Sequence, residues 1–221
     1  SGWPRPTVRR PSGPARWTSW AHHLSEARRV PRAVLDTDIL FSRVLHDLFG
    51  RLARRLRLFN LLWSDELLAE AKRKLIEEKA FSADAAERWV GYLPLNFPAG
   101  RVEIADARDG LNFAELTVDP GDHHVCALAV AGNADYLITR DQGYLPDGLR
   151  GHGVEVIAPD DLLCRALDDQ PQAVLDVLEL QAGEWGGGRP VAVLLEAFER
   201  AGAADFAGRA RAELAGSWSR T

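Results

Sequence analysis

The sequence is poor in sulfur, because it has two cysteines and no methionine. Cys126 and Cys164 each lie inside an apolar helical pattern, and neither has a second thiol nearby in the sequence. This spacing argues against a disulfide framework and against a zinc site, and it predicts a reduced, cytoplasmic protein. Since the chain begins with Ser1 and Gly2, we expect its first residues to be a processing remnant.

Long apolar runs and an excess of positive charge are also missing. No stretch of about 18 apolar residues offers a membrane span, so we expect no membrane association. Lys plus Arg is 27 and Asp plus Glu is 32, which gives 27 − 32 = −5. Without a global positive field, any binding to phosphates has to be local. The densest basic patch comprises Arg51, Arg54, Arg55 and Arg57.

The pattern that is present is that of an α/β domain. Short apolar runs alternate with amphipathic helical patterns, which predicts an α/β/α sandwich with a central, mostly parallel sheet. We expect strands at 33–36, 58–63, 102–105, 135–139 and 154–157, and helices at 39–55, 64–79, from 82, 125–131 and from 159. The predicted organisation is an extended or disordered arm at 1–31, a main domain at 32–168 and a C-terminal helical extension at 169–221.

Four acidic residues fall where strands end or where the following helices begin: Asp36, Glu70, Asp122 and Asp141. The carboxyl ends of parallel strands meet at one edge of a sheet, where α/β proteins bind ligands. Mg²⁺ and Mn²⁺ prefer carboxylate and water oxygens as ligands. Four such acids in one site would require a metal.

Each acid also has a structural interpretation. Asp38 can cap a helix that starts at Ile39, and Asp122 can cap the helix through Val125 in the same way. Most glutamates within helices, such as Glu70, are solvated, and Asp141 is a plausible turn residue. Taken singly, these structural roles are the commoner ones, so the order of the acids along the chain has to decide.

In the order of these acids along the chain, the sequence resembles the PIN-domain family of nucleases, in particular the ribonuclease toxins of toxin–antitoxin pairs. The first matching stretch, Val34 to Leu40, has an apolar pair before an Asp, a hydroxyl residue and a second acid. The second, Trp63 to Glu70, has a serine at a strand end and then a helix bearing an acid. The third and most specific runs from Asp119 to Asp141 through a helix, a turn and a strand.

The resemblance implies a metal-dependent endoribonuclease that uses Mg²⁺ or Mn²⁺. By the match, Asp36, Glu70, Asp122 and Asp141 are the metal ligands, and Asp38 and Asp119 are secondary candidates. Thr139 matches the hydroxyl that orients a ligand or a water. The implied substrate contacts are Arg140, which departs from the smaller residue usual there, and Arg54, Arg55 and Arg57. The implied partners are RNA, a cognate antitoxin protein and a second copy of the chain in a homodimer.

Two other functions remain open at this point. Asp36-Thr37-Asp38 also reads as the nucleophile and acid of a haloacid-dehalogenase-type phosphohydrolase, but that chemistry needs a later lysine and there is none after Lys79. A non-catalytic PIN-like module that only binds RNA or protein would have a broken acid set, whereas this set is intact. His123 and His124 are an unlikely metal pair because neighbours on a helix point about 100° apart.

Overall fold

The computed structural model describes residues 29–218. Most of the arm expected at 1–31 therefore lies outside the described residues, and 29–31 lead into the first strand without helix or strand structure. The strands are β1 (Arg32–Leu35), β2 (Asn60–Leu62), β3 (Tyr136–Ile138) and β4 (Glu155–Ile157). All neighbouring pairs are parallel, and the order across the sheet is β2-β1-β3-β4. The predicted α/β fold with a central parallel sheet is confirmed.

Helices fill the connections between the strands and continue to the end of the described chain. The α-helices are α1 (Thr37–Leu40), α2 (Arg43–Arg51), α3 (Asp65–Lys79), α4 (Ala83–Val90), α5 (Tyr92–Asn96), α6 (Ala105–Arg108), α7 (His123–Ala131), α8 (Pro146–Gly151), α9 (Pro159–Asp169), α10 (Pro171–Glu184), α11 (Val191–Arg200) and α12 (Ala204–Trp218). Ser64 and Ser82 cap α3 and α4 as predicted, with their hydroxyl oxygens accepting from Leu67 N and Ala85 N, respectively. Among the described residues, no helix is both long enough and apolar enough to cross a membrane.

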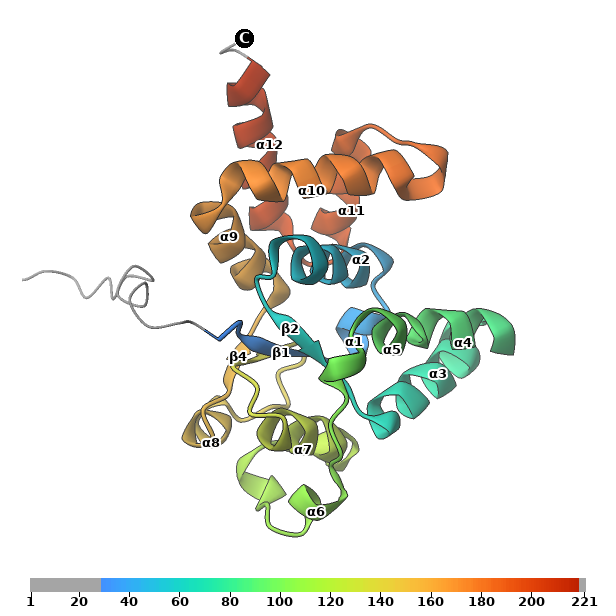
Figure 1. The fold of residues 1–221 in the computed structure, drawn as a ribbon, viewed down its shortest axis with the longest axis vertical. Coiled ribbons are helices and arrows are strands. Elements are labelled where there is room, and N and C mark those ends of the chain that lie inside the picture. The colour runs from blue at the N-terminus through green and yellow to red at the C-terminus, as the bar shows by residue number, and fades with distance from the viewer. Residues whose placement is uncertain (1–28, 219–221) are drawn as a thin grey trace, which may run out of the picture.

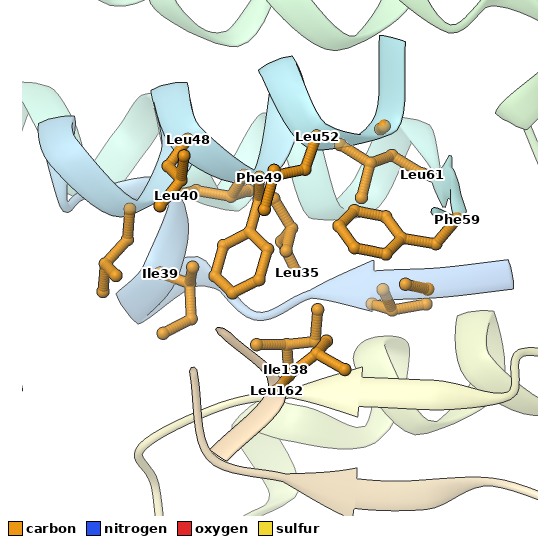
Figure 2. Close-up of a cluster of buried hydrophobic side chains, with 14 of the residues drawn as sticks. Leu35, Ile39, Leu40, Leu48, Phe49, Leu52, Phe59, Leu61, Ile138 and Leu162 are labelled. Atoms are coloured by element: carbon orange, nitrogen blue, oxygen red, sulfur yellow. The ribbon is translucent and has the colours of Figure 1, made fainter. Parts of the chain in front are cut away.

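The core lies on both faces of β1. Ala33, Val34 and Leu35 are all at most 1% exposed, as expected for a central parallel strand whose two faces are covered. Helix α2 covers one face and α7 lies on the other side of the sheet (Figure 1). Figure 2 shows Phe49 of α2 beside Leu35 and above Ile138. The sheet is therefore held rigidly, and its strand ends are fixed in relation to one another.

Three local predictions were wrong. The helix expected at 39–55 is interrupted after Leu40 and ends in a wide turn at Leu52–Leu56, because Asp36 starts a separate short helix first. Asp36, not Asp38, is the cap of that helix. The strand expected at 102–105 is reduced to a single bridge between Arg101 and Trp63, and the chain then turns into α6.

The C-terminal helices pack on the α2 side of the domain (Figure 1). Phe198 of α11 and Phe206 of α12 are fully buried in the same hydrophobic core as the sheet residues. The carboxylate of Asp160 in α9 accepts hydrogen bonds from the backbone N–H groups of Asp205 and Phe206, so it caps α12 from outside. Gln181 of α10 is buried and donates to the carbonyl of Val44 at 3.1 Å. The extension is thus joined to the main domain by apolar and polar contacts.

Candidate metal centre at the carboxyl edge of the sheet

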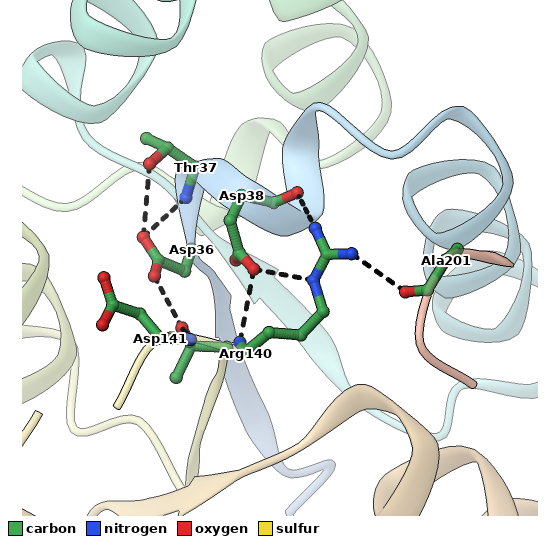
Figure 3. A network of polar contacts seen from close by, with 7 residues as sticks. Asp36, Thr37, Asp38, Arg140, Asp141 and Ala201 are labelled. Atoms are coloured by element: carbon green, nitrogen blue, oxygen red, sulfur yellow. Dashed lines mark hydrogen bonds and ion pairs between the residues drawn. The ribbon is translucent and has the colours of Figure 1, made fainter. Parts of the chain in front are cut away.

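Asp36 is the most buried acid of the predicted set, with 3% of its surface exposed. One carboxylate oxygen accepts from the backbone N–H of Thr37 at 2.6 Å, and the other accepts from the Thr139 hydroxyl at 2.7 Å (Figure 3). Burial raises the pKa of Asp36, and the hydrogen bond from Thr139 works in the opposite direction. The carboxylate is therefore held in one orientation at the end of β1.

Thr139 connects Asp36 with Asp141. Its hydroxyl donates to Asp36 and accepts from the backbone N–H of Asp141 at 2.9 Å. Its own backbone N–H donates to Ile157 O of β4, which fixes the residue at the end of β3. Asp141 also has the predicted turn role, since its carboxylate accepts from Gly143 N at 2.7 Å. One hydroxyl thus sets the relative positions of two acids.

Asp122 directly precedes α7, but its carboxylate makes no capping bond to that helix. The Thr117 hydroxyl lies 3.5 Å from one of its oxygens, at the limit of hydrogen-bonding distance. Burial raises the pKa of Asp122 to about 6, and so do the negative charges of Asp36, Asp119, Asp141 and Glu70, in that order. The capping interpretation of Asp122 is therefore wrong. Its carboxylate instead experiences the negative charges of several neighbouring acids.

Glu70 has partners on both of its carboxylate oxygens. Lys74 Nζ lies 2.9 Å from Oε1, and His124 Nε2 lies 2.8 Å from Oε2. Partial burial opposes ionisation of Glu70, but the contacts with His124 and Lys74 outweigh it and lower its pKa to about 2. The other ring nitrogen of His124 contacts the carbonyl of Gly121 at 2.8 Å. Glu70 is ionised and directed toward the start of α7, but it is already paired.

Asp38 and Arg140 form a separate ion pair at the same edge of the sheet. Arg140 Nε donates to Asp38 Oδ2 at 2.8 Å, and its two terminal nitrogens donate to the carbonyls of Asp38 and Ala201 at 2.8 and 2.9 Å. Figure 3 shows the guanidinium between Asp38 and Ala201. The structure thus uses Arg140 to connect the ends of β1 and β3 with the loop before α12. Its predicted contact with substrate stays a prediction.

The remaining predicted residues lie farther from Asp36 or have local roles. Asp119 caps the short turn before α7 by accepting from Gly121 N at 2.8 Å. Arg54 and Arg55 lie in the wide turn after α2, and Arg57 follows that turn just before β2. In a parallel crossover, this position is at the amino edge of the sheet, opposite the acids. The structure therefore does not bring these arginines to the acids.

Lys74 and Tyr144 are neighbours of the acids that the sequence reasoning missed. Lys74 follows Glu70 by four residues, a helical spacing that signals an ion pair and could have been used. Tyr144 is 3% exposed, and its hydroxyl faces the Asp36 carboxylate, where it acts to lower the pKa of that acid. Burial and the charges of Asp36 and Asp122 raise the pKa of Tyr144, so the phenol stays protonated near these acids. No local sequence signal identifies Tyr144.

The donor set fits a hard divalent cation by its chemistry. Asp36, Asp122 and Asp141 have no basic partner within ion-pair distance among the described residues, and the charges of Asp36 and Asp141 help to raise the pKa of Asp122. Carboxylates in this situation are stabilised by a bound cation. In the described part of the chain, however, no three Asp, Glu, His or Cys side chains are arranged closely enough to bind one metal ion. Glu70 would have to leave Lys74 or His124 to become a ligand.

A parallel α/β sheet with acids gathered at its carboxyl edge defines a candidate nuclease-type site. A family model of the PIN domain matches residues 32–143, from the start of β1 to just beyond Asp141. The chain therefore belongs to the PIN-domain family, whose members are generally nucleases. Comparisons with curated proteins and with solved structures gave no significant match.

Proposed function

We propose that the protein is a metal-dependent endoribonuclease that hydrolyses RNA phosphodiester bonds. The observation that carries the proposal is the grouping of Asp36, Asp122 and Asp141 at the strand ends of a PIN-domain sheet. None of the three has a basic side chain within ion-pair distance among residues 29–218. In this proposal Glu70 is the fourth ligand, and Mg²⁺ or Mn²⁺ is the ion. When bound, such an ion lowers the pKa of a coordinated water and neutralises developing charge on the phosphate.

The chain's own residues do the positioning. The Thr139 hydroxyl holds Asp36 in orientation and fixes the backbone of Asp141. Lys74 and His124 keep Glu70 ionised and directed toward the start of α7. Burial of Asp36 under Thr37 and Thr139 limits its access to water, which strengthens its interaction with any cation. Such preorganisation is what hydrolysis by a metal-activated water requires from a protein.

The toxin role and the partners belong to the same proposal. RNA as substrate and a cognate antitoxin rest on the resemblance to ribonuclease toxins. The acidic edge supports an antitoxin segment with a basic side chain that covers Asp36 and its neighbours, because opposite charges attract across an interface. We further propose a homodimer and a cytoplasmic location, where RNA is available. Co-purification of a small basic-tailed protein encoded beside this chain would test the antitoxin; purification of the chain without it would contradict this part.

The nuclease proposal is tested with purified protein and a total RNA pool. We expect cleavage with Mn²⁺ or Mg²⁺, none with chelator, and loss of cleavage in Asp36→Asn. Asp147→Asn is the matched control, because the Asp147 side chain is 97% exposed and lies in α8. Cleavage that persists with chelator, or in Asp36→Asn at the rate of the control, would contradict the mechanism.

The phosphohydrolase alternative is not favoured by the site. Such an enzyme needs Asp38 free to act as an acid beside the nucleophile, whereas Asp38 Oδ2 accepts two hydrogen bonds from Arg140. Its measurable signature is hydrolysis of p-nitrophenyl phosphate with a covalent phosphoryl intermediate on Asp36. We expect neither the hydrolysis nor the intermediate.

A further inference from the structure

A hollow lies on the α2 side of the molecule, away from the acids. Its volume is about 320 Å³, and residues of α2, α4, α5 and the end of α10 line it. This volume is within the range of about 300 to 1,000 Å³ that is typical of small-ligand sites. Because α10 supplies part of the wall, the hollow exists only where the C-terminal extension meets the PIN domain. We call it the arginine–aromatic pocket.

The charges in this pocket favour an anion. Three arginines line it, and two acids, Asp47 and Glu184, stand beside them. Arg51 is bonded to both acids at 2.8 Å, so it offsets one of their two negative charges and is itself already paired within the wall. Arg43 of α2 and Arg88 of α4 are exposed and have no acidic partner among residues 29–218. Two guanidinium groups therefore remain to bind a ligand such as a phosphate.

Aromatic rings form the rest of the wall. Trp89, Tyr92 and Trp185 line the pocket, and the Trp89 indole donates to Leu40 O at 2.8 Å, which fixes that ring. Trp185 is half-buried, with the Arg189 guanidinium 5.3 Å from its ring centroid. Flat rings beside guanidinium groups match a ligand that has both a planar and an anionic part.

A buried histidine gives a second, independent indication of a ligand. His46 lines the pocket and is 5% exposed, and its Nε2 has no hydrogen-bond partner in the part of the chain that the structure describes. Burial lowers its pKa to about 4, so the ring is neutral near pH 7. Buried polar atoms without a partner are rare because they cost free energy. A ligand with hydrogen-bonding groups, such as a nucleobase, would satisfy this atom.

The pocket is connected with the acidic edge of the sheet. A second, shallow hollow of about 350 Å³ shares Arg43 with the pocket and extends to Asp38 and Arg140, which follow the ends of β1 and β3. Lys79 and Arg200 also line it, so basic side chains outnumber the acid. A polyanion could follow these side chains from Asp38 and Arg140, which are close in sequence to Asp36 and Asp141, to the pocket.

We propose that the arginine–aromatic pocket binds one nucleotide of a single-stranded RNA whose backbone continues through the second hollow to the acidic edge. Arg43 and Arg88 hold the phosphate, and the base lies against the aromatic wall beside His46. The inference rests on the proposed ribonuclease function and assigns the C-terminal extension a part in substrate binding. A base must be unpaired to enter such a pocket, so single strands are favoured over duplexes. The arginines alone would suit an acidic peptide equally well, but the carboxylates of such a peptide would make no stacking contact with the aromatic wall.

The inference is tested by binding without catalysis. The full chain is titrated into a fluorescently labelled single-stranded oligoribonucleotide of about 12 nucleotides in the presence of chelator, and anisotropy is measured. We expect Trp185→Leu and Arg88→Ala each to weaken binding by about tenfold. Arg88→Ala should also reduce the slope of log affinity against log salt by about 0.7, whereas Trp185→Leu should leave the slope unchanged.

The matched control is Arg108→Ala. Arg108, like Arg88, is an exposed arginine in the last turn of its helix and has no acidic partner among the described residues, but it lies in α6 outside the pocket. Binding of all variants equal to wild type would overturn the inference. So would a duplex of the same sequence binding as tightly as the single strand, or a labelled acidic peptide that binds with the same dependence on Arg88 while the RNA does not.

Failure of the nuclease proposal can be told apart from failure of this inference. If the protein does not cleave RNA but the oligoribonucleotide binds with the expected variant pattern, the result supports the RNA-binding pocket and contradicts the nuclease proposal. If metal-dependent cleavage is observed but the pocket variants bind and cleave normally, the result supports the nuclease proposal and contradicts the pocket. Thermal unfolding of each variant, above all of Trp185→Leu at its half-buried position, checks that the substitutions leave the fold intact.

Discussion

Asp36 and Asp38 are two residues apart at the end of the same strand, but they lie in different surroundings. Asp38 shares a guanidinium with the loop before α12 through Arg140. Asp36 is bound by uncharged donors such as Thr37 and Thr139. In the described chain, neither it nor Asp122 nor Asp141 has a basic side chain within ion-pair distance. This edge of the sheet therefore has a balanced half, where Arg140 pairs with Asp38 and contacts the C-terminal extension, and an unbalanced half of unpaired acids, which is suited to a cation.

The largest expected effect separates the two halves by activity. Asp122→Asn should reduce metal-dependent RNA cleavage by more than about a hundredfold, because losing even an outer neighbour of a metal site costs about 10 to 100-fold. Asp38→Asn should reduce it by no more than about fivefold, since an exposed ion pair is worth about 0 to 1 kcal/mol. Initial rates on one defined RNA measure both. Equal losses in the two variants would remove the distinction between the halves.

A smaller loss is expected when the orientation of Asp36 is disturbed. Thr139→Val removes the hydroxyl that bonds Asp36 and the Asp141 backbone, and it should reduce cleavage by about 10 to 100-fold. Thr139→Ser keeps the hydroxyl and serves as the control, with a rate near that of wild type. If valine and serine behave alike at this position, the positioning role of Thr139 is wrong.

The unbalanced half should also weaken the metal-free fold. Because the pKa of Asp122 is raised to about 6 in the fold from 3.8, the native state binds the extra proton between these values and stability falls as pH rises through this window. In chelator at pH 7.5, Asp122→Asn should therefore raise the free energy of unfolding by about 1 kcal/mol. The difference should shrink toward zero as pH falls to 4. Urea unfolding at several pH values measures it, and a variant less stable than wild type at pH 7.5 would contradict the repulsion.

The balanced half should show a modest coupling. A double-mutant cycle of Asp38→Ala and Arg140→Ala should give a coupling free energy of about 0.5 to 1 kcal/mol in unfolding, because the pair is partly exposed. Additive effects of the two substitutions would mean that the pair contributes nothing to stability. A parallel measurement of RNA affinity in Arg140→Ala would test the predicted substrate contact of this arginine.

Much of the fold could be predicted from the sequence, because short apolar runs between amphipathic patterns mark the strands of a parallel sheet. The sheet strands were predicted within a few residues, and the caps Ser64 and Ser82 were found from local chemistry. The strand order could not be read, since pairing depends on contacts far apart in the sequence. The short helix that Asp36 caps was missed because a helical pattern continues past the interruption at Phe41 and Ser42.

The site was predicted only as a set of acids. Sequence order identified which acids lie at strand ends, but it could not show which of them have basic partners. The Asp38 and Arg140 pair spans 102 positions, and the contact of His124 with Glu70 depends on how α7 packs against α3. The pocket beside α10 is formed by α2, α4, α5, α10 and the turn after α10, so no local sequence pattern predicts it.

A metal centre that depends on Asp36 is tested by calorimetric titration of Mn²⁺ into the full chain and its Asp36→Asn and Asp38→Asn variants. We expect binding to the wild type, binding of similar affinity to Asp38→Asn, and no measurable binding to Asp36→Asn. Binding to Asp36→Asn with the affinity of the wild type, or no binding to the wild type itself, would contradict a metal centre at the unbalanced half of the edge.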